Sequence, residues 1–216
     1  MSFAGFFVFV VTILALHGLR AGLNPAEHTI SEYSLGSYGW VMRLAFLAQG
    51  AGTLNTAASL GLSCGPAGWR RIGLLLLAGT AIGLFIDAGF NTDHLRVPET
   101  VDGSIHGVGT LIIALALPKA ALILGSDCVR NSVPTLKARL LPILGAAQLV
   151  AIVLYEVSPT TLRGWVERLV TVFVVATLGL MQLISRMNAT GGRPRTVAHN
   201  YRKGPVFGLS PVATGD

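Results

Sequence analysis

Six long apolar runs constrain this chain more than any other feature of its sequence. Each is close to the roughly 20 residues that a helix needs to cross about 30 Å of hydrocarbon. Charged residues make up only 12% of the chain and mean hydropathy is +0.64, values far from those of soluble domains. The runs cover residues 3–19, 40–62, 72–90, 105–124, 140–157 and 165–185.

These runs predict an all-α fold. Backbone groups inside a bilayer must be paired within their own segment, which favours helices and excludes an open sheet. The first run lacks the positive flank and the small-residue cleavage site of a secretory signal, so we expect a retained helix. Residues 1–186 are therefore predicted to form a bundle of six transmembrane helices.

The distribution of Lys and Arg predicts how the bundle is oriented. Cytoplasmic flanks collect these residues, and most of the sixteen follow the second, fourth and sixth runs. This places both termini in the cytoplasm, with residues 187–216 as a flexible basic tail. The net charge of +6 is then topological. It does not indicate nucleic acid, because the cations are divided among loops and lack interleaved aromatic residues.

Most of the ten acidic residues fall on the predicted outer side, together with all but one of the five histidines. Asp87 and Glu156 lie inside runs, near their outer ends. A carboxylate at the bilayer centre costs about 2.5–3.5 kcal/mol, so a partner or a water-filled pocket is expected for both. Arg43 either extends its head group to the interface or pairs with one of these two acids. Glu27, His28 and Glu99 are expected to be ordinary solvated loop residues.

The segment 90–107 carries the densest set of ionisable side chains. Asp102 or Ser104 is expected to cap the fourth helix, and Asp102 would share a helix face with His106. A carboxylate beside an imidazole suits acid/base chemistry or a metal. No Cys/His quartet or His-Glu-x-x-His motif is present, so no metal ligands are predicted.

Two further patterns concern packing. The stretch "GTAIG", residues 79–83, has the small-residue spacing that lets two membrane helices approach closely. Gln49, Asn55 and Gln148 lie inside runs and are expected to form hydrogen bonds between helices.

Three segments, "ISEYSLGSYGWVMR", "GFNTDHLRVPETVDGSIHG" and "LRGWVERLV", resemble the hallmarks of an uncharacterised bacterial membrane family, domain of unknown function nine-nine-eight. The resemblance covers nearly the whole chain except the tail and implies about six spans. Asn91 stands where the family usually has Pro. The residues that match the family motifs are Ser31, Glu32, Thr92, Asp93, Gly103, His106, Gly164, Glu167 and Arg168.

All matched residues lie in the predicted outer loops or next to them, which suggests one extracytoplasmic polar pocket. Our first hypothesis is that this pocket binds or processes a lipid or isoprenoid-like ligand, with Glu32, Asp93 and His106 as catalytic candidates. The second is a non-catalytic membrane protein whose outer polar residues form interhelical salt bridges; a small transporter ranks third. No feature specifies a cofactor or an oligomeric state. The proposed ligand-binding residues are Ser31, Arg43, Asp87, Glu156, Glu167 and Arg168.

The predicted orientation has a direct test. A reporter fused after the last residue is expected to be active only in its cytoplasmic form, because the Lys- and Arg-rich flanks stay inside. A fusion placed in the 90–100 loop should give the opposite result. Activity of the carboxyl-terminal reporter outside the cell would contradict the orientation.

Overall fold

The computed structural model describes residues 2–63, 68–94, 97–131 and 136–190, and over these residues the chain is all-α. This confirms the predicted fold class. A long connection joins the first two helices. It contains Asn24 and Pro25 and, further on, a short 3-10 turn, η1. The elements are α1 (Ser2–Leu19), η1 (Ser31–Ser34), α2 (Gly39–Ser63), α3 (Gly68–Gly89), α4 (Val101–Asn131), α5 (Leu136–Val157) and α6 (Arg163–Thr190).

Every predicted run corresponds to one helix, although the helix ends differ. α4 begins at Val101, four residues before the predicted start, and α6 continues to Thr190. Residues 187–190 of the predicted tail are therefore helical, and 191–216 lie outside the described residues. Four helices, α3 to α6, are long and apolar enough to cross a membrane, and Phe3–Leu19 forms a shorter apolar helix. The chain is thus a multi-pass membrane protein, and six crossings remain a prediction.

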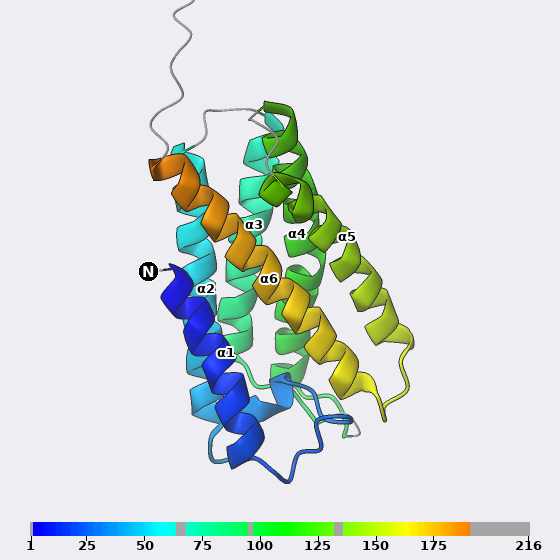
Figure 1. The fold of residues 1–216 in the computed structure, drawn as a ribbon. Helices are drawn as coiled ribbons and strands as arrows, with labels where there is room; N and C mark the ends of the chain where they lie inside the picture. Colours follow the sequence, from blue (N-terminus) through cyan, green and yellow to red (C-terminus); the bar gives the residue numbers. More distant parts are fainter. Residues whose placement is uncertain (1, 64–67, 95–96, 132–135, 191–216) are drawn as a thin grey trace, which may run out of the picture.

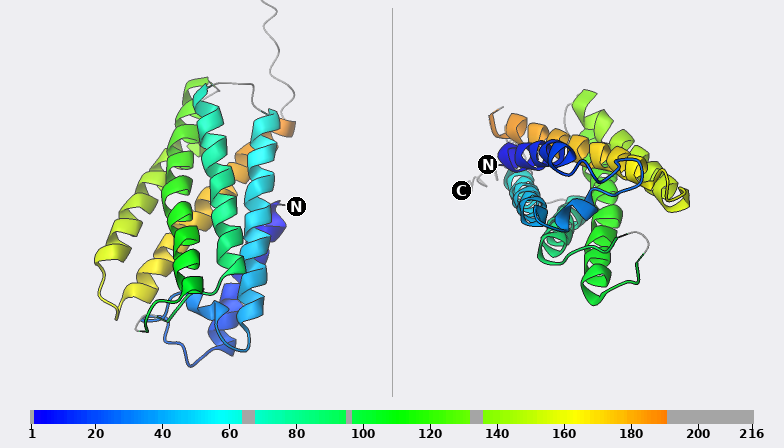
Figure 2. Two further views of the ribbon diagram at one scale, coloured as in Figure 1. Left: turned by 180° about the vertical axis from the view of Figure 1, so that it is seen from behind. Right: turned by 90° about the horizontal axis from the view of Figure 1, so that it is seen from below.

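The helices form two layers. α2, α3 and α4 stand side by side, and α1, α6 and α5 pack across them, with α6 running diagonally (Figure 1). The view along the bundle in Figure 2 shows α1 beside α6 on one side of the three-helix layer. Three connections lie together at the lower end in Figure 1. We call this end, formed by the described parts of 20–38, 90–100 and 158–162, the polar end.

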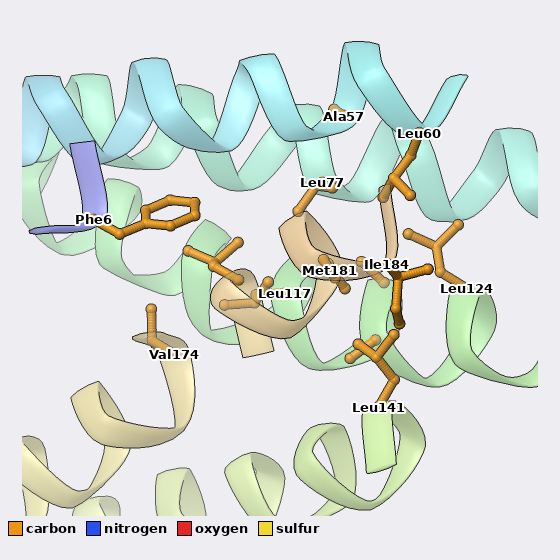
Figure 3. Close-up of a cluster of buried hydrophobic side chains, with 13 residues drawn as sticks. Phe6, Ala57, Leu60, Leu77, Leu117, Leu124, Leu141, Val174, Met181 and Ile184 are labelled. Atoms are coloured by element: carbon orange, nitrogen blue, oxygen red, sulfur yellow. The ribbon is translucent and has the colours of Figure 1, made fainter. Parts of the chain in front are cut away.

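The interior is filled by interlocking apolar side chains. Leu77, Leu117 and Met181, from three different helices, are almost fully buried in the cluster of Figure 3. Apolar side chains also point outward, and Phe7 and Leu75 are about 70% exposed. A soluble bundle would place polar residues on these faces. Lipid tails accept apolar ones, so close packing rather than the hydrophobic effect selects the inner faces.

Glycine permits the closest approach between α3 and α4. A Cβ added at Gly83 would lie 2.6 Å from the carbonyl oxygen of Gly109, closer than real contacts allow. One added at Gly79 would meet nothing within 4 Å. The predicted contact motif of 79–83 is therefore correct at Gly83 and wrong at Gly79, because only Gly83 faces α4.

Polar contacts between helices differ from those predicted. Thr56 donates to Gln182 across α2 and α6 at 2.7 Å, a pair that the sequence analysis did not select. Within the described residues, the side chains of Gln49 and Gln148 are buried without a hydrogen-bond partner, so the predicted bonds from these two are wrong. At the end opposite the polar end, the Arg70 Nε donates to Asp127 at 2.7 Å. This pair joins α3 to α4 there.

The glycine contact generates a matched pair of variants. Gly83→Ala should lower the thermal unfolding midpoint in detergent, because the added methyl meets backbone and overpacking costs about 1–3 kcal/mol. Gly79→Ala should leave the midpoint unchanged or raise it slightly, since alanine favours helix. Equal midpoints for the two variants would show that α3 and α4 do not approach at Gly83.

Candidate functional site

The polar end is held together by contacts between segments that are distant in sequence. The Gly164 amide donates to the Ala26 carbonyl at 2.9 Å, which joins the start of α6 to the first connection. The His94 Nδ1 lies 2.9 Å from the Glu32 Oε2, which joins the third connection to the first. These contacts bring together the α1–α2 connection, the α3–α4 connection and the start of α6, and the family motifs lie in these segments or next to them.

Glu32 is at the centre of this arrangement and is fully buried. Its Oε2 lies 2.7 Å from the His28 Nδ1 as well as beside His94, and its Oε1 accepts the Thr29 amide at 3.2 Å. Burial raises the pKa of the Glu32 carboxyl, but the hydrogen bonds from His28, His94 and Thr29 lower it by more. The pKa of Glu32 is therefore below its usual value, which favours the ionised carboxylate.

Glu167 anchors the first connection to α6. Its carboxylate accepts the backbone amide of Ile30, and the Ser31 hydroxyl lies 3.5 Å from the Oε1. Ser31 and Glu167, both predicted to bind a ligand, are therefore brought together. Among the described residues, their hydrogen bonds are with each other and with the backbone, which gives them a structural role in positioning η1.

Arg168 makes the largest set of bonds at the polar end. Its Nη1 donates to the carbonyls of Pro25, His28 and Gly164, each at 2.9 Å. Its Nε donates to the His17 Nε2 at 3.0 Å, and its Nη2 to the Tyr33 hydroxyl at 3.1 Å. The planar guanidinium thus connects α1, the first connection and α6.

Gly164 explains the spacing of the Gly-x-x-x-Arg motif. A Cβ at Gly164 would lie 2.4 Å from the Pro25 carbonyl oxygen and 2.5 Å from that of His28. Only glycine at this position lets the backbone of the first connection, from Pro25 to His28, lie against α6. Arg168, one turn later, donates to the same two carbonyls.

Asp93 organises the start of α4. Its Oδ2 accepts the Thr100 amide at 2.7 Å and its Oδ1 the Thr100 hydroxyl at 2.9 Å, while the Thr100 Oγ1 accepts the Gly103 amide at 3.0 Å. Thr100 is therefore the helix cap, and the predicted caps Asp102 and Ser104 are wrong. A Cβ at Gly103 would collide with the Asp93 carboxylate, which explains the glycine of the Gly-x-x-His motif.

His106 faces α3 instead of Asp102. Its Nδ1 lies 3.0 Å from the Phe90 carbonyl oxygen and 3.8 Å from the Asp87 Oδ1, and Asp87 also accepts the Thr110 hydroxyl at 3.2 Å. His106 and Asp87 are both buried, whereas Asp102 is exposed. Asp102 and His106 lie one turn apart on α4, as expected, but the carboxylate near the imidazole is that of Asp87.

Arg43 and Glu156 stand apart from these clusters. No ion pair among the described residues joins Arg43 to Asp87 or Glu156, so the first of the two alternatives, pairing with one of these acids, is wrong. Glu156 is exposed and Arg43 is half-buried. The other interpretation, in which the Arg43 head group extends to the interface, fits this placement.

A groove of about 500 Å³ opens between α1 and α6, which lie side by side in Figures 1 and 2. Arg168 lines it, together with His17, whereas Glu32, Asp93 and His106 do not. The three catalytic candidates therefore do not share this groove with Arg168. The remaining lining residues are Val10, Ile13, Leu14, Ile30, Thr171, Val172, Val175 and Ala176.

Sequence reasoning missed several residues of the polar end. His28 was assigned to solvent, His94 was given no partner, and neither Tyr33 nor Thr100 was selected. The spacing of His28 and Glu32, four residues within a turn, was the one available local signal. The contact of His94 with Glu32 spans 62 residues and no sequence motif marks it.

A bundle with lipid-compatible outer faces and a network of polar loops at one end defines an integral multi-pass membrane protein. A family model described as protein of unknown function (DUF998) matches residues 3–184, and the chain belongs to this family. The suspected resemblance is thereby confirmed. No curated protein and no solved structure matches the chain.

The Arg168 network predicts that lysine cannot replace arginine. Arg168→Lys should lower the thermal midpoint clearly, because one ammonium cannot reach carbonyls, an imidazole and a hydroxyl together. Each hydrogen bond to a charged group contributes about 1.5–3 kcal/mol. Arg163→Lys on the same helix is the control. Arg163 lies over the Tyr155 ring, and a lysine ammonium can make the same cation–π contact. Similar midpoints for the two variants would contradict the assigned role.

Proposed function

We propose that this protein is a lipid-binding membrane protein that holds a lipid with an anionic headgroup in the α1–α6 groove, at the extracytoplasmic leaflet. The observation that carries the proposal is the pairing of an apolar groove with the Arg168 guanidinium. The apolar part of the groove would hold an acyl or isoprenoid chain, and the Arg168 guanidinium would bind the headgroup. The partners are then the bilayer and this lipid.

The size and lining of the groove support a chain-like ligand. A volume of about 500 Å³ falls within the usual range of small-molecule sites. Val10, Ile13, Leu14 and Val172 provide apolar walls from both helices. Because α1 and α6 are outer elements of the bundle, a lipid would enter sideways from the bilayer.

Charge at Arg168 supports an anionic headgroup. Its described partners are carbonyls, a hydroxyl and an imidazole, and no carboxylate of the described residues lies within ion-pair distance. The guanidinium therefore keeps a positive charge without a paired anion. One bond is described from Nη2, which carries two N–H groups, so a donor is left for a phosphate or carboxylate oxygen.

Tryptophan positions support the assignment of the polar end to a membrane interface. Trp40 and Trp165 are exposed near the polar end, and Trp69 is exposed at the other end of the bundle. Indole rings prefer the headgroup level on either side. The Lys and Arg distribution supports the extracytoplasmic side for the polar end.

A non-catalytic structural protein is the second candidate. It is favoured by the carboxylates of Asp93 and Glu167, which accept backbone amides and thereby hold loops in place. In this case the groove between α1 and α6 would have no headgroup preference.

Lipid retention distinguishes the candidates. The protein is purified in detergent, incubated with phosphatidylglycerol or phosphatidylcholine, and analysed by native mass spectrometry. We expect the anionic lipid to be retained preferentially. Ala176→Trp should abolish this preference because the indole fills the groove that Ala176 lines. Ala51→Trp, at an exposed position of α2, is the matched control and should retain the lipid.

Two results would contradict the lipid proposal. One is equal retention of phosphatidylglycerol and phosphatidylcholine by the unmodified protein. The other is unchanged retention of phosphatidylglycerol by Ala176→Trp, which would place the lipid elsewhere on the surface.

A further inference from the structure

We propose that His28, Glu32 and His94 form a binding site for a divalent transition-metal ion, with zinc as the best-fitting metal. The site is separate from the α1–α6 groove, and the inference does not rest on lipid binding.

The ligand set and its geometry carry the proposal. Each of the three residues offers one ligand atom, and these atoms all lie within 4.8 Å of one another. Two imidazoles and one carboxylate form a ligand set that zinc uses in proteins with three protein ligands. Zinc bonds of about 2.0–2.2 Å to nitrogen and oxygen require only a small outward shift of the three side chains.

Convergence on one oxygen is the unusual feature of this cluster. The His28 Nδ1 and the His94 Nδ1 both approach the Glu32 Oε2, at 2.7 and 2.9 Å. One imidazole would be enough to pair a buried carboxylate. Here two imidazoles from separate loops place their Nδ1 atoms next to the same oxygen. A metal ion between these three atoms could be bound by all of them.

Bonds from neighbouring groups fix the Glu32 side chain, the backbone of His28 and the residue next to His94. The Thr29 amide donates to the Glu32 Oε1, which leaves the Oε2 for the ion. Arg168 holds the His28 carbonyl, and Asp93, next to His94, is held by Thr100. Hydrogen bonds to a ligand side chain, like the bond from Thr29 to Glu32, orient the ligands of protein metal sites.

Access from solvent is also suitable. The side chains of His28 and His94 are 33% and 50% exposed, whereas that of Glu32 is 1% exposed. An ion can therefore enter from the outer surface and meet a buried anionic ligand. Three protein ligands leave one coordination position for water or for an anionic group.

The test uses the full-length protein in detergent. After removal of metal with a chelator, Zn²⁺ or Co²⁺ is added and bound metal is measured after gel filtration. We expect one equivalent of Zn²⁺, and with Co²⁺ the visible absorption of a tetrahedral site. His94→Ala should weaken binding by about tenfold or more, since even loss of a supporting residue costs 10- to 100-fold. Glu99→Gln, an exposed carboxylate in the same loop, is the control and should bind like the parent.

Thermal unfolding in the same samples separates lost binding from lost folding. Zn²⁺ should raise the midpoint of the parent and of Glu99→Gln, because a ligand that binds only the folded state stabilises it. The midpoint of folded His94→Ala should not respond. Absence of stoichiometric Zn²⁺ in the parent, or equal affinity of parent and His94→Ala, would overturn the proposal. Neither result bears on lipid retention, so the two proposals fail separately.

Discussion

The attachment of the first connection to α6 is the interaction on which the polar end depends. A segment of nineteen residues between α1 and α2 has little regular structure of its own, apart from the η1 turn. Arg168 and Glu167, adjacent on α6, bind its carbonyls and one of its amides. Gly164 provides the space for this backbone to lie against the helix. One helical turn of α6 therefore determines the shape of a loop that is distant in sequence.

From this attachment the remaining contacts follow in order. Fixing the His28 backbone places its ring beside Glu32, and Glu32 in turn receives His94 from the third connection. The neighbouring Asp93 binds Thr100 and so fixes the start of α4. Each motif of the family thus has a physical role in joining loops. The same attachment positions the Arg168 guanidinium at the end of the groove beside α1.

Much of the fold was predictable because membrane helices leave a strong local signal. The length and apolarity of the runs predict all six helices. Each run matches one helix, so locating the helices needs little tertiary context. Helix ends were less predictable. α4 begins earlier than expected because Thr100, bound by Asp93, caps it, and this contact depends on loop packing.

The site was predictable by location but not by pairing. Charge distribution and motifs correctly brought Glu32, Glu167 and Arg168 to one end. The individual contacts were not predictable, because His94 reaches Glu32 through a tertiary contact and His106 lies against Asp87 in α3 and against Phe90, which follows α3. Arg43 illustrates the same limit. The sequence offers several possible partners for a single cation in an apolar run, and only the packing of the helices selects among them.

Hydrogen exchange of the native protein in detergent micelles tests the central claim most directly. The amides of Thr29 and Ile30 donate to the carboxylates of Glu32 and Glu167, so we predict exchange as slow as that of flanking helix amides. The amide of Thr161, an exposed residue of the connection at the same end, should exchange rapidly in the same spectra. Exchange of Ile30 at the rate of an unstructured peptide would contradict the attachment of this loop to α6, and rapid exchange of Thr29 would contradict its bond to Glu32 within the loop.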